Sequence, residues 1–151
     1  MDVEVVRAEL ADKEVLRQLL EFNAYEFARL SDDAVLNERG RFGYSWLDHY
    51  WTEPTRHPFL IRVRGQIGGI VLVTGTDPRS IAEFLVMPQY RRLGVGLAAA
   101  RYVFELFGGA WSVHEVPGNE AAVAFWRRAI PVEFAETCDD DGTTQRFRMP
   151  T

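Results

Sequence analysis

The segment Val86-Met-Pro-Gln-Tyr-Arg-Arg-Leu-Gly-Val-Gly96 leads from an apolar strand through two arginines and two spaced glycines into a helix. Glycines at 94 and 96 remove side chains that would block the close approach of a ligand to the backbone. Successive N–H groups of such a turn can point at one anion, and the following helix adds the positive end of its dipole. Arg91 and Arg92 supply two full charges beside the turn. The segment therefore predicts a phosphate-binding turn between a strand and a helix.

The spacing of the glycines excludes two common nucleotide-binding turns. A G-x-G-x-x-G dinucleotide fingerprint is absent after Gly94, and no G-x-x-x-x-G-K-[ST] pattern occurs in the chain. What remains is Arg-x-x-Gly-x-Gly, preceded by Val-x-Pro. A second pattern, Asn119-Glu-Ala-Ala-Val-Ala-Phe-Trp126, follows after one further helix and strand. The structural alternative is an ordinary strand-to-helix turn with surface arginines.

Together these two motifs resemble those of the GNAT superfamily of N-acetyltransferases. The resemblance implies an α/β (α+β) fold with a central mixed sheet of about six to seven strands, splayed middle strands and flanking helices. It also implies acetyl-CoA as the acyl donor. Within the superfamily, the phrase Tyr50-Trp-Thr-Glu-x-x-Arg-His-Pro-Phe-Leu60 is similar to one in a set of small bacterial predicted acetyltransferases.

Composition excludes several other classes of protein. A chain of 151 residues, 47% hydrophobic and 26% charged, suits one globular domain, residues 1–151. The net charge of −5 argues against nucleic acid as the main partner and fits an amine-bearing one. No apolar run is long enough to cross a membrane. The single Cys138 and the absence of a leader at the N-terminus predict a cytoplasmic protein. One cysteine and three histidines form no ligand-spacing pattern, so no metal is expected.

The order of predicted elements matches the GNAT topology over nearly the whole chain. Apolar residues at spacings of three and four predict helices from Asp12 to about Phe27, over 95–107, and after Asn119 up to Pro131. The aromatic-dense segment 39–55 is expected to be partly helical. Apolar and β-branched runs predict strands at 3–7, 58–63, 67–73, 80–86, 111–116, 132–136 and 145–149.

The resemblance assigns the coenzyme residues. The pyrophosphate is expected on the backbone of the turn, formed by Arg91, Arg92, Leu93, Gly94, Val95, Gly96 and Leu97. The pantetheine arm is expected along the preceding strand, at Phe84, Leu85 and Val86, with an N–H near Val86 polarising the thioester carbonyl. Asn119 is expected both to cap its helix, worth about 1 kcal/mol, and to touch the arm. Phe125 and Trp126 complete this set.

Glu83 is the leading candidate for the general base. Strand alternation places it on one face with Ile81 and Leu85, which predicts a raised pKa or a position open to a cavity beside the thioester. The alternative is a solvated or ion-paired glutamate at a sheet edge. His114 is the second candidate because its ordinary pKa lies near neutrality, with a hydrogen-bonded structural histidine as the alternative.

The general acid is not evident in the sequence. The superfamily often has a tyrosine directly after the position of Phe125, and this chain has Trp126, whose indole does not release its proton at useful pH. The remaining candidates for the acid that protonates the thiolate are Tyr90, Tyr102, Tyr44 and water. Otherwise CoA leaves as a thiolate, or turnover is poor.

The acceptor site is expected between the first helix and the first hairpin. Carboxylates and aromatic faces suited to a cation gather there at Trp46, Asp48, His49, Tyr50 and Glu53. The alternative is that the aromatic residues are core and rim and the carboxylates are solvated.

The expected function is acetyl transfer from acetyl-CoA to a primary amine of a small molecule or peptide. Direct attack in a ternary complex is preferred, because Cys138 lies in the distal hairpin and no other thiol is present. A non-catalytic acyl-CoA-binding sensor or interaction module is the alternative, and acyl transfer to a hydroxyl is a third. Terminal strand hairpins often mediate pairing in related folds, so the resemblance allows a homodimer, but the sequence does not set the oligomeric state.

Overall fold

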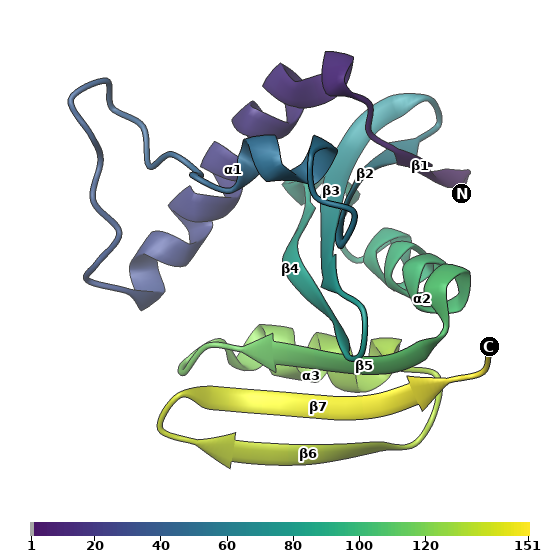
Figure 1. Cartoon of the computed structure of the whole chain (residues 1–151). Helices are drawn as coiled ribbons and strands as arrows, with labels where there is room; N and C mark the ends of the chain where they lie inside the picture. The colour runs from purple at the N-terminus through teal and green to yellow at the C-terminus, as the bar shows by residue number, and fades with distance from the viewer. Residues whose placement is uncertain (1) are drawn as a thin grey trace.

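The computed structural model describes residues 2–151, which form one seven-stranded sheet with helices on both faces (Figure 1). The strand order is β1-β2-β3-β4-β5-β7-β6. The strands are β1 (Val3–Arg7), β2 (Arg56–Val63), β3 (Gln66–Gly75), β4 (Arg79–Val86), β5 (Gly109–Glu115), β6 (Phe134–Asp139) and β7 (Gly142–Met149). The helices are α1 (Lys13–Phe27), α2 (Val95–Phe107) and α3 (Glu120–Ala129).

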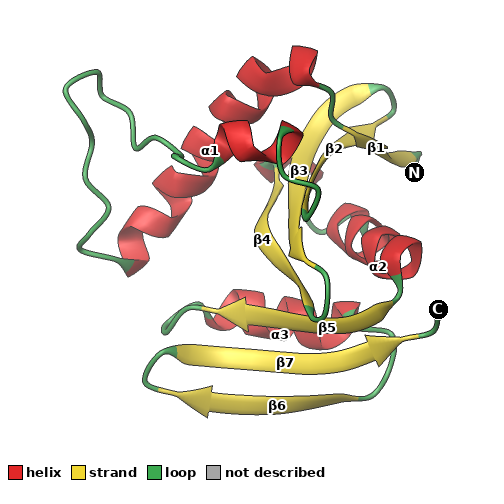
Figure 2. Cartoon of the chain, viewed as in Figure 1, coloured by secondary structure: helices red, strands yellow, loops and turns green. Residues whose placement is uncertain are grey.

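A fork divides the sheet between β4 and β5. These two strands are parallel, and their pairing consists of Arg79 opposite Trp111, whereas the neighbouring strand pairs are antiparallel over five to eight positions. Beyond Arg79 and Trp111 the strands diverge, as Figure 2 shows. The predicted mixed sheet with splayed middle strands is therefore confirmed.

Two apolar cores hold the helices on the sheet. On one face, Leu16, Leu19 and Leu20 of α1 pack against Leu72 and Leu85 of the sheet. This cluster is called the α1-side core. On the other face, α2 and α3 pack against the sheet in a second cluster, the α2-side core, which includes Val71, Val103, Phe104, Trp111 and Trp126. The spacing of three and four along each helix produces these buried stripes.

The segment 39–55 departs from the expectation of a partial α-helix. Its one helical element is a single 3₁₀ turn, Leu47–Trp51. Glu21 of α1 accepts hydrogen bonds from the backbone N–H groups of Phe42 and Gly43, both at 2.8 Å. The segment is thus held both by a side chain of α1 and by the backbone hydrogen bonds of its 3₁₀ turn.

The closing hairpin is longer and begins later than predicted. β6 starts at Phe134 rather than at 132, because Val132 packs against the α2-side core within the connection from α3. β7 already begins at Gly142.

A β-bulge in β4 changes which side chains share a face. Leu72 of β3 pairs with Glu83, and the next residue, Val73, pairs with Ile81, so Ala82 is an extra residue on β4. Ile81 packs against the α2-side core, whereas Leu85 lies in the α1-side core and Glu83 bonds to α1. The expectation that Glu83 shares a face with Ile81 is therefore wrong, because the bulge breaks the strand alternation on which it rested.

Candidate active site

The turn before α2 has the backbone conformation of an anion-binding loop. Arg92 and Gly94 both lie in the left-handed region, with φ of 63° and 82°, and α2 begins at Val95. Left-handed residues within such a turn direct successive N–H groups to one side. A methyl group added at Gly94 would meet no atom within 4 Å. The turn therefore leaves open space at Gly94 for a ligand.

Gly96 has a different role from the one predicted. A methyl group at this position would lie 3.1 Å from Cε1 of Phe125 and 3.5 Å from Cγ2 of Val86. Its missing side chain therefore allows α2 to pack closely against α3 and β4. This close contact sets the position of the turn.

The two arginines of the turn are not equivalent. Arg91 donates from Nε to the carbonyl oxygen of Val86 (2.8 Å), and its Nη2 pairs with Oε1 of Glu26 (2.6 Å). Its charge is thus compensated, and it fastens the turn to β4 and α1. Arg92 has no ion-pair partner among residues 2–151. Of the two, Arg92 is the one free to bind an anion.

A cleft with a volume of about 950 Å³ opens where β4 and β5 diverge. The turn, α3 and the end of α1 complete its walls. This volume lies at the upper end of the range for small-molecule sites. Leu93 and Val95 lie outside the lining, because the Leu93 side chain is half exposed and Val95 is buried in the α2-side core. The predicted residues that line the cleft are Glu83, Phe84, Leu85, Val86, Arg91, Arg92, Gly94, Gly96, Leu97, His114, Asn119, Phe125 and Trp126.

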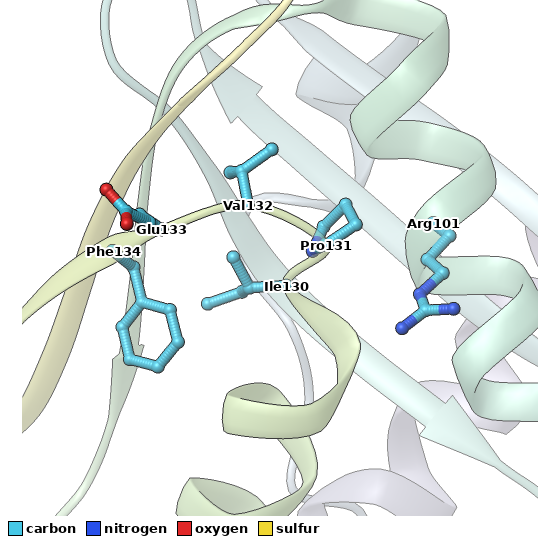
Figure 3. A pocket seen from close by; sticks show the side chains of 6 residues that line it. All are labelled: Arg101, Ile130, Pro131, Val132, Glu133 and Phe134. Atoms are coloured by element: carbon cyan, nitrogen blue, oxygen red, sulfur yellow. The ribbon is translucent and has the colours of Figure 1, made fainter.

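A second pocket, of about 730 Å³, lies between α2 and the connection after α3 (Figure 3). Arg101 faces residues 130–134 there and donates to the carbonyl oxygens of Ala129 (3.3 Å) and Arg128 (3.1 Å). The guanidinium thus satisfies carbonyls at the end of α3. No predicted site residue lines this pocket.

The backbone of β4 turns alternate residues toward the cleft. Met87 donates from its N–H to the carbonyl oxygen of Gly68 (2.8 Å), and hydrogen-bonded pairs alternate along an antiparallel ladder. Leu85 therefore directs its backbone groups to β3, and Phe84 and Val86 direct theirs away from β3. The bond from Arg91 to the carbonyl of Val86 agrees with this orientation. Phe84 and Val86 are thus placed to bond a ligand, whereas Leu85 contributes its side chain to the α1-side core.

Asn119 and the aromatic residues of α3 form another wall of the cleft. Asn119 precedes α3 but makes no side-chain capping bond, so the predicted cap is wrong and its amide remains free beside the cleft. Phe84 lies 5.5 Å from Phe125 and 5.0 Å from Trp126, measured between ring centroids. These rings give the cleft an apolar wall.

Glu83 is held from the α1 side. Asn23 donates from Nδ2 to Oε1 of Glu83 at 3.1 Å, and Asn23 is only 3% exposed. Burial raises the pKa of Glu83 to about 7, against the lowering effect of this hydrogen bond. The sequence analysis gave no role to Asn23, which lies on the buried stripe of α1. A polar residue within an otherwise apolar stripe was the available signal.

Two tyrosines lie near Glu83 on the same face. The hydroxyls of Tyr44 and Tyr50 are 3.2 Å apart. Burial raises the pKa of both hydroxyls, and the charge of the nearby Glu83 raises it further. Neither they nor the other candidate acids, Tyr90 and Tyr102, line the cleft.

Both ring nitrogens of His114 are engaged by the closing hairpin. A carbonyl oxygen only accepts, so the Nε2–H donates to Asp141 (2.9 Å) and Nδ1 accepts from the hydroxyl of Thr144 (2.8 Å). No ring nitrogen is left to take a proton from a substrate.

The predicted acceptor residues lie outside the cleft lining. Asp48 forms an ion pair with Lys13, and Glu53 pairs with Arg56 at 3.1 Å. The guanidinium of Arg56 lies 4.9 Å from the Trp46 ring and 5.4 Å from the Tyr50 ring. His49 lies against Trp46, with 5.4 Å between ring centroids. The two carboxylates are therefore neutralised within the protein, and of the five only Tyr50 lies near Glu83.

Glu115, at the end of β5, is a cleft residue that sequence reasoning missed. It is 3% exposed, and Gln145 donates from Nε2 to its Oε1 at 2.8 Å. Its Oε2 has no hydrogen-bond partner in residues 2–151. Burial raises its pKa to about 7. Alternation with the buried Trp111 and Val113 was the signal that could have identified it.

Residues 2–151 show neither a metal-binding cluster nor a membrane-spanning helix. In the described part of the chain, no group of three or more His, Cys, Asp or Glu side chains is arranged to hold a metal ion. None of the helices within residues 2–151 combines the length and apolar character needed to span a membrane.

Comparison with known families identifies the chain. Residues 16–130 match the family model described as "Acetyltransferase (GNAT) family". The chain belongs to this family. A search of curated proteins finds no significant match.

Solved structures of GNAT acetyltransferases share the fold over nearly the whole chain. An acetyltransferase of the GNAT family from Staphylococcus aureus superposes with a TM-score of 0.71 at 14% identity, over 99% of this chain and 100% of that one. The ribosomal-protein-S18-alanine N-acetyltransferase of Escherichia coli gives 0.68 at 14% identity, over 99% and 96%. The PaiA N-acetyltransferase of Thermoplasma acidophilum, in complex with coenzyme A, gives 0.66 at 11% identity, over 98% and 99%.

Proposed function

We propose that residues 1–151 form a single acetyl-CoA-dependent N-acetyltransferase domain that acts on a primary amine of a small molecule or peptide. Membership of the GNAT family supports acyl transfer. The observation that carries the proposal is the position of Glu83, a carboxyl with a pKa of about 7 in the wall of the forked cleft. A base with this pKa is half ionised at neutral pH and can accept a proton from an ammonium group.

The cleft suits a long anionic coenzyme. Arg29, Arg92 and Arg128 line it, and none of them forms an ion pair within residues 2–151. The turn leaves open space at Gly94, and the amide of Asn119, which makes no capping bond, lies at the start of α3 in the cleft lining. Backbone groups of Phe84 and Val86 are available for the amides of a pantetheine arm. Acetyl-CoA, when bound, supplies the acetyl thioester.

The residues of the chain then have distinct tasks. Glu83 removes a proton from the amine, while Asn23 fixes its Oε1 and leaves Oε2 free of side-chain bonds. The N–H of Val86 faces the gap and stabilises negative charge on the reacting carbonyl oxygen. His114 takes no part, because both its ring nitrogens are engaged. Cys138 lies exposed on β6 outside the cleft lining, so direct attack is preferred to an acyl-cysteine route.

One observation favours the alternative of a non-catalytic acyl-CoA sensor. No tyrosine is among the residues that line the cleft, and the position after Phe125 holds Trp126. The thiolate therefore lacks the acid that the superfamily often provides.

Calorimetry with acetyl-CoA, followed by detection of released CoA thiol across a panel of amines, tests the proposal. We expect binding, and turnover with at least one amine. Arg92→Gln should weaken acetyl-CoA binding by roughly tenfold to 100-fold, since a charge-assisted bond contributes about 1.5–3 kcal/mol. Arg39→Gln, in the exposed loop, is the matched control and should bind as the unaltered protein does. Binding without turnover across polyamines, aminoglycosides, amino acids and peptides would favour the sensor, and absence of binding would refute both.

A further inference from the structure

Each strand of the fork carries a glutamate that lines the cleft. β4 and β5 last pair at Arg79 and Trp111, and four residues further along each strand lie Glu83 (83 − 79) and Glu115 (115 − 111). At a rise of about 3.3 Å per residue, Glu115 lies roughly 13 Å beyond the fork, and Glu83 lies nearer to it because the bulge at Ala82 adds one residue to β4. Both line the cleft. The divergence of the strands thus leaves one carboxyl on each wall.

The two carboxyls serve opposite faces of the sheet. Glu83 bonds to α1, whereas Glu115 is on the face of β5 that carries Trp111 and Val113 of the α2-side core. Trp126 packs into that same core from α3. Glu115 is therefore on the face where a tyrosine in place of Trp126 would lie.

The surroundings of Glu115 favour a protonated carboxyl. Its Oε1 accepts from Gln145 of β7, and its Oε2 is a buried atom without a donor. Glu136 of β6 raises the pKa of Glu115 and Arg127 of α3 lowers it, but burial has the largest effect and brings it to about 7. A carboxyl whose second oxygen receives no hydrogen bond is best accommodated when that oxygen carries a proton.

We propose that Glu115 is the general acid of the transfer, delivering a proton from Oε2 to the sulfur as the acetyl group leaves. This inference rests on the proposed acetyltransferase function. In the step, the carbon–sulfur bond breaks with its electron pair on sulfur, the O–H bond of Glu115 breaks, and an S–H bond forms. Glu115 is left as a carboxylate and regains a proton from solvent. Glu83 carries away the proton of the amine, so each carboxyl moves one proton in each cycle.

A binding experiment tests this without turnover. Affinities for CoA and for desulfo-CoA, which lacks the sulfur, are measured by calorimetry between pH 6 and pH 8. If the sulfur shares a proton with Glu115, the ratio of the two affinities changes with pH, by about tenfold for a bond of about 1.4 kcal/mol. Glu115→Gln should make the ratio constant. Glu136→Gln, which alters the same polar cluster outside the cleft lining, should keep the pH dependence.

Kinetics give an independent readout once an amine has been found. Glu115→Gln should lower kcat by roughly 100-fold with an unchanged KM for acetyl-CoA, and the alkaline limb of the pH profile should disappear. A pH-independent affinity ratio in the unaltered protein would overturn the proposal, even if Glu115→Gln failed to fold. An equal pH dependence in the folded variant would also overturn it. Failure of the unaltered protein to bind either ligand would instead refute the acetyltransferase function itself.

Discussion

Asn23 of α1 donates a hydrogen bond to Glu83 of β4 across 3.1 Å, and so joins the first helix to one strand of the fork. Asn23 is buried on the stripe of α1 that carries Leu19 and Leu20, and Glu83 lies on the α1 side of β4 in regular alternation with Leu85. One buried amide thereby fixes the orientation of the proposed base. It also opposes the effect of burial on the pKa of Glu83.

Replacing the base tests its role directly. Glu83→Gln should lower kcat by about 100-fold to 10,000-fold, the range for general base catalysis, with little change in acetyl-CoA affinity. Because the pKa of Glu83 is about 7, activity of the unaltered protein should rise with pH through 7, and the variant should lack this acidic limb. Glu4→Gln, on the exposed surface of β1, is the matched control. Unchanged turnover and pH profile in Glu83→Gln would remove Glu83 as the base.

Asn23→Leu should raise the pKa of Glu83 further, because it removes the one hydrogen bond that lowers it. Carbon-13 NMR of the glutamate carboxyls should show the Glu83 resonance titrating at higher pH, with the acidic limb of kcat moving in the same direction.

Asn23→Leu should also change how the free energy of unfolding depends on pH. The folded-state pKa of Glu83 lies above its unfolded value of 4.5, so its ionisation lowers the free energy of unfolding as pH rises from 4.5 through 7. Asn23→Leu should therefore be more destabilising at pH 9 than at pH 5. In a Glu83→Gln background this difference should vanish, as a double-mutant cycle requires. A persistent difference would mean that Asn23 acts on some other group.

The coenzyme turn could be predicted because its determinants are local. The two glycines, the arginines and the start of α2 all lie within eleven residues, and the strand, turn and helix formed as expected. The resemblance to the GNAT superfamily then implied the splayed middle strands. Local patterns of this kind survive folding because they depend little on distant contacts.

What the sequence did not reveal depends on contacts between distant segments. Arg91 pairs with Glu26, 65 positions away, so its charge is compensated within the protein. Gln145 reaches Glu115 from a strand 30 positions away. The bulge at Ala82 is set by pairing with β3, and no local residue pattern marks it. These three features decide which charges face the cleft.

Gly69 sets the spacing between β3 and β4. A methyl group added there would lie 1.9 Å from the carbonyl oxygen of Leu85, a backbone atom that cannot move aside cheaply. Gly69→Ala should therefore lower the free energy of unfolding by about 3 kcal/mol or more, measured by urea denaturation. Gly40→Ala, in a loop with no atom within 4 Å, is the control and should cost only about 1–2 kcal/mol from its φ of +72°. Equal losses would show that the strands can separate at Gly69 without penalty.

The ion pair between Arg127 and Glu136 ties α3 to β6 and should govern stability in acid. Arg127 donates two hydrogen bonds to Glu136, at 2.9 and 2.6 Å, and these, with a bond from Gln145, lower the pKa of Glu136 to about 2. A carboxyl whose folded-state pKa is lowered stabilises the protein above its unfolded pKa of 4.5, and this contribution is lost as pH falls toward 2. Thermal melting should therefore show Glu136→Gln less stable than the unaltered protein at pH 7, with the difference shrinking by pH 3. Glu14→Gln, which removes a carboxylate paired with Arg17 on the surface of α1, controls for the change in net charge. A difference for Glu136→Gln that is the same at pH 7 and pH 3 would show that the pair does not contribute through ionisation of Glu136.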